Sequence, residues 1–314
     1  MVKQNKLASR KIHIPVFSPV DDFEYWNFII KTENGEFIKV SFSINETFNV
    51  PIQSSVKFYY IDKDFNQHIE TFCVDSNKNQ FSEIECDINI NDNYCIEYDD
   101  YYELNVLINR SGLCLKIEAL EQSDLSDNKG IVSQNLVGTK FLGWAYPFVK
   151  SKCQGTLICN GVKTEIKGEG TMLHCWGNDY IGKELECLIT GEIYLDNQSC
   201  LYFIMIRDTH VEANLIVKQE GKILRYIKDY ESNDFDIKIK NQRKYRDMYY
   251  PVDINISRPG EINFDLNILK EFSQNKNTPS SLKSTLHFNA IGEYSIDYQN
   301  LNYQGTSILD LYLF

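Results

Sequence analysis

An alternation of apolar and polar residues with a period of two runs through most of this chain. In the segment 38–44, every second residue is apolar, and the residues between are Lys or Ser. The same pattern returns in the segments 84–90, 113–117, 235–239, 252–257 and 262–268. Alternate side chains of a strand point to opposite faces, so each segment predicts a β-strand with one buried and one wet face.

Turn signals separate these segments, and helical periodicity is weak. The dipeptides Asn34-Gly35 and Asn160-Gly161 favour two-residue hairpins, because both residue types tolerate positive φ. Pro259-Gly260 predicts a further turn. The segments 223–230 and 269–273 are long enough for one helical turn each. We therefore expect an all-β protein of antiparallel strands, with barrel or sandwich architecture.

A polar stretch divides the chain into two strand-rich parts. Residues 121–130 read EQSDLSDNKG, which is the composition of an exposed linker. A chain of 314 residues is long enough for two domains. We expect an N-terminal β-domain over residues 1–130 and a C-terminal β-domain over residues 131–314.

Charge and hydropathy exclude two classes of partner. The chain has 44 acidic against 32 basic residues, a formal net charge of −12, and so lacks the basic surface that nucleic acids need. It also has no run near the ~20 apolar residues of a membrane-spanning helix. No apolar segment follows the basic N-terminus, and none of the nine cysteines forms a CxxC pair. We expect a cytoplasmic protein with reduced thiols.

Motifs for cofactors, metals and covalent catalysis are missing from the sequence. There is no glycine-rich phosphate loop, GxSxG, HExxH or EF-hand loop. The five histidines are scattered without paired spacing. We expect no cofactor and no metal; the oligomeric state stays open.

The segment 168–177, GEGTMLHCWG, is the first candidate site. Its glycines permit a bend or a close approach of another backbone. In an extended chain His174 and Trp176 project to one side and Leu173 to the other. A His and a Trp on one face can line an apolar pocket with one titratable group. The simpler alternative is a core Trp beside a hydrogen-bonded His.

Two aromatic clusters are further candidates. Residues 23–28 read FEYWNF and include Tyr25 and Trp26, and residues 143–148 read GWAYPF and include Trp144 and Tyr146. Rigid aromatic faces suit an apolar ligand, although they also fill barrel ends or domain interfaces. Glu24 adds a carboxyl group that an apolar wall would tune for acid–base chemistry. Because acidic residues are abundant, a solvated face is the alternative for Glu24.

These segments together resemble the carotenoid 1,2-hydratase and AttH-like family of lipocalin-like two-domain proteins. FEYWNF stands where many members carry an EWWYF-like motif, and GEGTMLHCWG stands where they carry G-x-G-Y-H-D-H-N-W-G. The family includes carotenoid hydratases, fungal lipocalin-like Diels–Alderases and survival-factor proteins. The resemblance implies two tandem lipocalin-like β-domains that hold an apolar substrate or ligand in a shaped cavity.

The chain departs from the family's motif where the hydratase chemistry is thought to occur. Aligning Trp176 with the final tryptophan of the motif puts the family's aspartate at Leu173 and its second histidine at His174. A leucine cannot protonate a double bond, so a hydratase of that kind is not expected. The resemblance then favours a cofactor-independent cyclase or isomerase, similar to a pericyclase or Diels–Alderase, that shapes a polyene, polyketide or terpenoid in natural-product biosynthesis.

In this hypothesis His174 is the catalytic residue. The residues expected to bind substrate around it are Glu24, Tyr25, Trp26, Trp144, Tyr146, Leu173 and Trp176. Two other functions stay open: a non-catalytic carrier for a lipid or terpenoid, and a scaffold that uses its strand edges. The partner expected for the enzyme or the carrier is a hydrophobic small molecule.

Overall fold

The computed structural model describes most of the chain between residues 23 and 313. The described ranges are 23–44, 53–75, 79–81, 86–122, 134–135, 141–177, 187–195, 198–207, 210–219, 222–228, 236–245, 248–272, 286–298 and 301–313. Every regular element in these ranges is a β-strand, which confirms the all-β prediction; the two segments that could hold a helical turn are strand wherever they are described. In the same ranges no helix has the length and apolar character that a membrane crossing requires.

The chain divides into two units, residues 1–180 and 181–314. The first contains β1 (Phe23–Thr32), β2 (Phe37–Ile44), β3 (Gln53–Ile61), β4 (Gln67–Asp75), β5 (Asn79–Phe81), β6 (Asp87–Ile90), β7 (Asn93–Glu97), β8 (Tyr102–Ile108), β9 (Ser111–Gln122), β10 (Gln134–Asn135), β11 (Phe141–Cys159) and β12 (Val162–Gly177). The second contains β13 (Cys187–Leu195), β14 (Gln198–Arg207), β15 (His210–Gln219), β16 (Lys222–Lys228), β17 (Asp236–Tyr245), β18 (Met248–Arg258), β19 (Ile262–Phe272), β20 (Leu286–Tyr298) and β21 (Leu301–Leu313).

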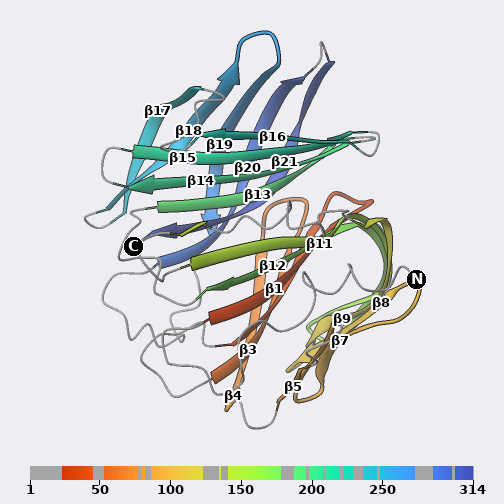
Figure 1. Cartoon of the computed structure of the whole chain (residues 1–314). Coiled ribbons are helices and arrows are strands. Elements are labelled where there is room, and N and C mark those ends of the chain that lie inside the picture. The colour runs from red at the N-terminus through yellow and green to blue at the C-terminus, as the bar shows by residue number, and fades with distance from the viewer. Residues whose placement is uncertain are drawn as a thin grey trace. The chain divides into compact units, whose positions relative to one another are not determined.

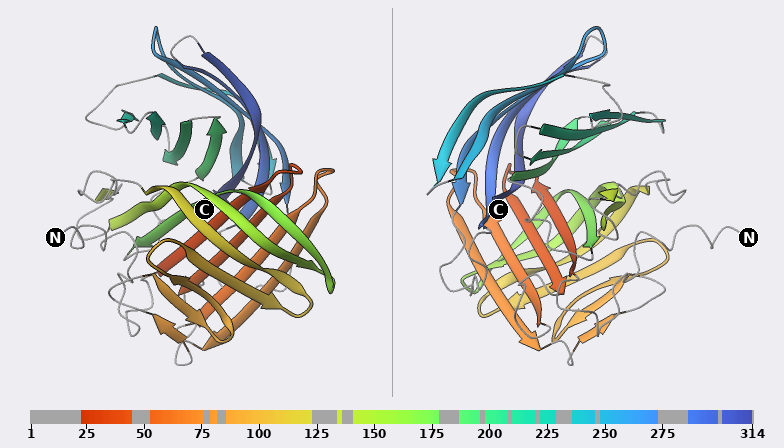
Figure 2. Two further views of the ribbon diagram at one scale, coloured as in Figure 1. Left: turned by 90° about the vertical axis from the view of Figure 1, so that its right-hand side faces the viewer. Right: turned by 60° about the vertical axis from the view of Figure 1, so that its left-hand side comes forward.

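The first unit is one antiparallel sheet that curls into a nearly closed barrel (Figures 1 and 2). Its strand order is β4-β3-β2-β1-β12-β11-β9-β8-β7-β6-β5, with β10 beside β11. Side-chain hydrogen bonds join β4, at one end of the strand order, to β9 and to the turn between β8 and β9. His68 Nε2 lies 2.8 Å from Ser111 Oγ, and Asn109 Nδ2 donates to Glu70 Oε2 over 2.7 Å. These bonds join distant parts of the sheet and so hold the barrel nearly closed.

The second unit is a curved antiparallel sheet with the order β16-β15-β14-β13-β21-β20-β19-β18-β17 (Figure 2). The turn at Pro259-Gly260 joins β18 to β19 as expected, with Gly260 at φ 78°. One face of β18 to β21 carries the apolar core of this unit, including Ile254, Phe264 and Leu266. The nearly closed barrel and the half-open second sheet are the two lipocalin-like domains that the resemblance implied.

The division between the units differs from the expected boundary at residue 130. The segment 141–177 forms β11 and β12, which pair with β9 and β1 of the first sheet. The linker-like composition of 121–130 therefore marks a connection within the first unit, and the division falls after residue 180. Composition detects an exposed connection, but it does not report which sheet the following strand joins.

Hairpin geometry follows the sequence at one Asn-Gly pair and departs from it at the other. β11 and β12 are joined by Asn160 and Gly161 alone, with φ values of 52° and 83°. β1 and β2 are joined by the longer connection 33–36, in which only Gly35 has positive φ. Asn34-Gly35 therefore marks the hairpin correctly, although the turn is not a two-residue one.

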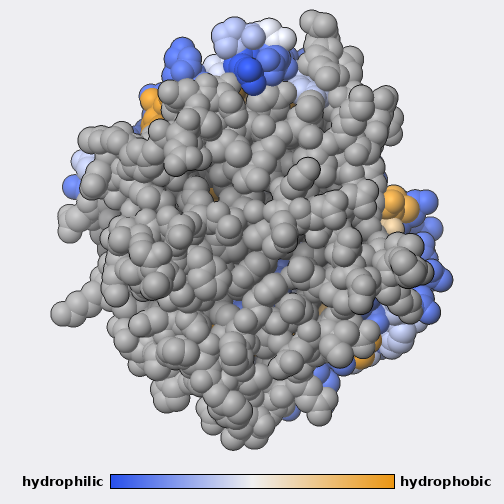
Figure 3. Space-filling model, in the orientation of Figure 1, coloured by the Kyte–Doolittle hydropathy of each residue, from blue (hydrophilic) through white to orange (hydrophobic). Residues whose placement is uncertain are grey.

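The barrel interior is filled by the apolar residues of the alternating strands. Trp26, Phe28, Val40, Phe42 and Phe58 are all at most 1% exposed. The opposite face of these strands includes the face expected to be wet in 38–44, and for β2 that expectation is wrong. Its polar residues Lys39, Ser41, Ser43 and Lys57 are at most 7% exposed. Elsewhere the coloured surface in Figure 3 is mainly hydrophilic, with isolated hydrophobic side chains.

The β7–β8 hairpin carries a tyrosine whose ionisation is suppressed. The Tyr94 hydroxyl donates to Glu103 Oε1 over 2.6 Å, and this bond, with burial and the negative charge of Glu103, raises the pKa of Tyr94 to about 12. Stability from this bond is therefore present below pH ~10 and is lost as the pH rises toward 12, because the unfolded chain releases the proton first. We expect the chemical shift of the Tyr94 Cζ carbon to titrate near pH 12 and to move back toward pH ~10 in Glu103→Gln. A midpoint unchanged by Glu103→Gln would contradict this assignment.

Candidate functional site

The pairing of β1 with β12 brings the two sequence motifs together. In the register of these antiparallel strands Trp26 lies opposite His174, Glu24 opposite Trp176, and Phe28 opposite Met172. Side chains of directly opposed residues share one face of the sheet. Trp26, Phe28 and Met172 belong to the core of the barrel, so His174 lies on the interior face.

A carboxyl–imidazole pair lies on this face. Glu24 Oε1 and His174 Nε2 are 2.6 Å apart, and both side chains are fully buried. The Trp26 ring stacks on the imidazole, with 4.8 Å between ring centroids and 13° between their planes. We call Glu24, Trp26 and His174 the interior triad. With Glu24 ionised, Nε2–H is the donor of this bond, which fixes the orientation of the ring.

The buried environment of the triad strengthens the hydrogen bond between Glu24 and His174. A hydrogen bond with a charged partner is roughly twice as strong as a neutral one, and it is little screened in an apolar interior. Burying a polar or charged group is costly unless it is paired and hydrogen-bonded, and Glu24 and His174 supply that partner to each other. The triad therefore combines an imidazole, a carboxyl group that fixes its orientation and an indole ring stacked on it, which suits an oriented hydrogen-bond donor.

Two predicted site residues lie on the other face of the same strands. Leu173 is opposite Asn27, and Tyr25 is opposite Cys175, so neither shares the face of His174. Leu173 is 2% exposed and Cys175 is fully buried; burial raises the pKa of the Cys175 thiol. Leu173 and Tyr25 therefore lie on the opposite face of the sheet from His174, and their expected contacts with substrate stay predictions.

The glycines before the triad allow the close approach of β1 that the sequence suggested. A Cβ atom on Gly168 would lie 2.3 Å from the carbonyl oxygen of Lys31, and one on Gly170 would lie 2.8 Å from Cys153 Sγ. β12 continues through both to Gly177, so the glycines lie inside the strand that carries His174.

The third motif also joins this region, through β11. Gly143 pairs with Trp176, Trp144 with Cys175, and Ala145 with His174, before the pairing becomes irregular toward Phe148. Phe148 belongs to the barrel core and packs on the Tyr102 ring, with centroids 5.1 Å apart. The side chains of Trp144, Tyr146 and Trp176 lie outside the described part of the chain, and their expected contacts with substrate stay predictions.

Comparisons with solved structures give the same architecture. An AttH-like protein from Nitrosomonas europaea aligns with a TM-score of 0.65 and 13% identity over 92% of this chain and 91% of its own. Kievitone hydratase from Nectria haematococca gives 0.66 and 12% over 98% and 94%. CghA, crystallised with Sch210972, gives 0.60 and 11% over 99% and 95%. This chain has the fold of these proteins.

The fold resemblance read from the sequence is thereby confirmed, although at about 12% identity the likeness carries the fold alone. Neither protein-family models nor curated protein sequences give a match. The roles of individual residues therefore rest on the geometry of this chain.

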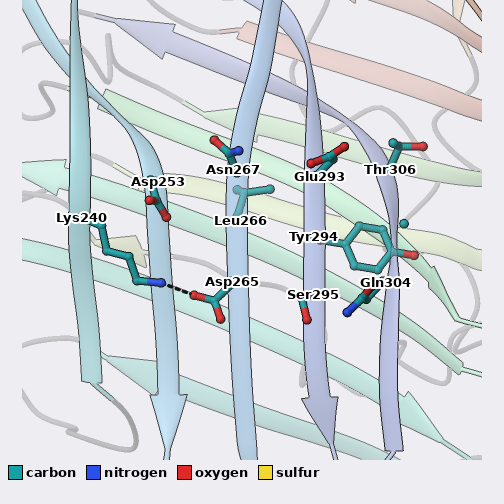
Figure 4. Close-up of a pocket in the computed structure, with 11 residues that line it drawn as sticks. Lys240, Asp253, Asp265, Leu266, Asn267, Glu293, Tyr294, Ser295, Gln304 and Thr306 are labelled. Carbon is teal, nitrogen blue, oxygen red and sulfur yellow. Dashed lines mark hydrogen bonds and ion pairs between the residues drawn. The ribbon is translucent and has the colours of Figure 1, made fainter.

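A hollow on the second unit is unsuited to an apolar substrate. It is an open pocket of about 550 Å³ on the second unit, lined by residues of β17 to β21. Figure 4 shows carboxylates along it, with Lys240 Nζ 2.6 Å from Asp265 Oδ1. Burial acts to raise the pKa of Asp265, but hydrogen bonds from Lys240 and Asn255 hold it below its usual value. None of the predicted site residues lines this pocket.

Metal-binding chemistry finds no support in the described residues. They contain no group of three or more His, Cys, Asp or Glu side chains that could hold a metal ion. The feature that the sequence did not supply is the pairing of Glu24 with His174, two residues 150 positions apart. The sequence holds no local signal for this pairing, because the two residues lie on strands that are far apart in the chain.

Proposed function

We propose that this chain is a cofactor-independent enzyme, a cyclase or isomerase that shapes an apolar polyene, polyketide or terpenoid in natural-product biosynthesis. The observation that carries the proposal is the fully buried Glu24–His174 pair with Trp26 stacked on its imidazole. The fold neighbours add support, since they include a protein named a hydratase and one crystallised with a small molecule.

The physical argument starts from the cost of the pair. Apolar residues of similar volume stabilise a core as well as a buried ion pair does, or better. Stability alone therefore gives no reason for a carboxyl–imidazole pair among Phe, Ile and Val side chains. Buried titratable groups with a specific partner are instead typical of functional sites.

In the proposed reaction the chain supplies shape and one polar contact. Opening of the packed interior beside His174 would admit a flexible substrate, and the aromatic and aliphatic side chains would hold it in a folded, reactive conformer. His174, whose Nε2 is held by Glu24, would donate a hydrogen bond from Nδ1–H to a substrate carbonyl and draw electron density from the adjacent alkene. Trp26 would pack against the apolar part of the substrate. No covalent intermediate is required.

The experiment compares His174→Gln with a matched histidine variant. Apolar molecules that co-purify with the protein are identified by mass spectrometry, and linear precursors of the same skeleton are then incubated with the wild type. We expect His174→Gln to lower kcat about 10²–10⁴-fold with little change in KM, because the lost contact acts in the transition state.

The control is His68→Gln, which changes a histidine of the same barrel that bonds Ser111. It is expected to keep kcat within about twofold. Full activity of His174→Gln would remove His174 from the mechanism. Recovery of an unchanged co-purified molecule, with no turnover of any precursor, would instead favour the carrier function.

A further inference from the structure

The backbone ladder between β18 and β19 ends before the strands do. Its last pair is Asp253 with Asn267, which lie on neighbouring strands in Figure 4. Beyond this pair, β18 runs from Val252 back to Met248 and β19 runs on to Phe272, and in these described stretches no backbone pairing joins the two strands. This end of β18 therefore pairs with β17 alone.

Irregular pairing in three neighbouring strands lies at the same level of the sheet. The register of β17 on β18 shifts on both sides of the pair Asn241 and Asp253, and that of β19 on β20 shifts between Ile268 and Lys270. Pro251 has no backbone donor, so it cannot complete a regular ladder on both sides of β18. Bulges interrupt pairing and bend strands. We call these positions the bulge line.

The end of the β17–β18 hairpin beyond the bulge line forms a unit of its own. It comprises residues 242–245 of β17 and 248–252 of β18, and the two strands stay paired to the end of β17. We call it the flap. Its residues Tyr250 and Val252 pack in the core of the second unit, at 5% and 7% exposure. A two-stranded hairpin is marginally stable by itself, so this packing and the contacts with β19 hold the flap in place.

Glu271 of β19 bridges the gap in the ladder. Its Oε1 accepts from Arg243 Nη1 over 2.7 Å and from the Tyr250 hydroxyl over 2.9 Å. Arg243 is directly opposite Tyr250 in the flap, so the three side chains form a row across three strands. Side-chain bonds thus take the place of backbone bonds here, and one carboxylate holds both strands of the flap.

We propose that the flap opens as a unit about the bulge line, with Glu271 as its latch. Opening breaks the two bonds to Glu271 and withdraws Tyr250 and Val252 from the core, while β19 to β21 stay paired. Such local opening requires less free energy than unfolding of the whole unit. The flap belongs to the second unit, so its opening does not depend on the role of His174.

Thiol labelling with iodoacetamide measures the opening. Val252→Cys places a small apolar reporter in the flap, and the native Cys187, fully buried in the same core, reports opening of the rest of the unit. Mass spectrometry of the peptides gives the rate at each position. We expect the reporter to be labelled faster than Cys187 and with a weaker dependence on urea, because the flap exposes less surface than the unfolded unit. Equal rates with equal urea dependence would overturn the proposal.

The latch is tested by adding Glu271→Met, which removes the acceptor and keeps the length of the side chain. We expect labelling at position 252 to rise about tenfold through the loss of two hydrogen bonds, with the rate at Cys187 unchanged within about twofold. The control Glu261→Met removes the partner of Arg258 at the end of β18 that does pair with β19, and it is expected to leave both rates unchanged. An unchanged rate at position 252 in Glu271→Met, or an equal rise at Cys187, would contradict the latch.

Discussion

Glu24→Ala is expected to lower the free energy of unfolding by about 3–5 kcal/mol, because it leaves the imidazole of His174 buried without its carboxyl partner. The bond that is lost spans 2.6 Å between two side chains with no exposed surface. Water therefore does not replace the carboxyl group, and the substitution also opens a cavity beside Trp26. Urea unfolding at neutral pH, with an unchanged m-value as the check on two-state behaviour, measures the loss.

The matched control removes the whole pair. Glu24→Met/His174→Phe replaces both polar side chains with slightly larger apolar ones of similar shape and leaves an aromatic ring for Trp26 to stack on. We expect this double variant to lie within about 1–2 kcal/mol of the wild type, and above Glu24→Ala, since no polar group is stranded. A double-mutant cycle with the single variants isolates the coupling between the two groups. A Glu24→Ala variant as stable as the wild type would show that the pair is not formed in solution.

This comparison also bears on why the pair is there. A double variant that is stable but inactive would separate the structural contribution of Glu24 and His174 from their role in turnover. If the pair were retained for stability, the order of stabilities would be reversed, and the double variant would be less stable than Glu24→Ala. The measurement therefore tests the premise of the proposed function without requiring its substrate.

The fold was predictable from the sequence because local patterns decide strands. The alternation in 38–44 gives β2, and Asn160-Gly161 gives a two-residue turn with both φ values positive. The burial of the polar face of β2 was not predictable. Lys39, Ser41 and Ser43 are polar and yet buried, because polar residues are accepted inside when they find partners, as Ser43 does with Ser55. Alternation separates two faces but does not report what covers each one.

The residues of the candidate site could be predicted from the sequence, but their arrangement in space could not. Period two already separates Leu173 from His174, yet the register of β1 on β12 is needed to put Glu24 and Trp26 on the His174 side. That register joins positions 150 apart, and no local propensity encodes it.

Gly168→Val is expected to lower the free energy of unfolding by about 3 kcal/mol, because its side chain would meet backbone atoms. A Cβ atom at this position lies 2.3 Å from the Lys31 carbonyl oxygen and 3.0 Å from Thr32 Cα. Neither atom belongs to a flexible side chain, so β1 itself must move away from β12. Urea unfolding of the variant and the wild type measures the cost.

The control for Gly168→Val is Gly35→Asn. Gly35 has a φ of 83° and open space where its Cβ would be, and Asn tolerates that conformation, so the loss is expected to stay near ~1 kcal/mol or below. The two variants thus separate steric exclusion from backbone freedom. The displacement in Gly168→Val also affects the triad, because Glu24 and Trp26 belong to β1 and His174 belongs to β12. We therefore expect the variant to lose more turnover than its loss of folded protein accounts for. Equal stability of the two glycine variants would mean that β1 and β12 are not packed at this distance, and the Glu24–His174 bond would lose its structural basis.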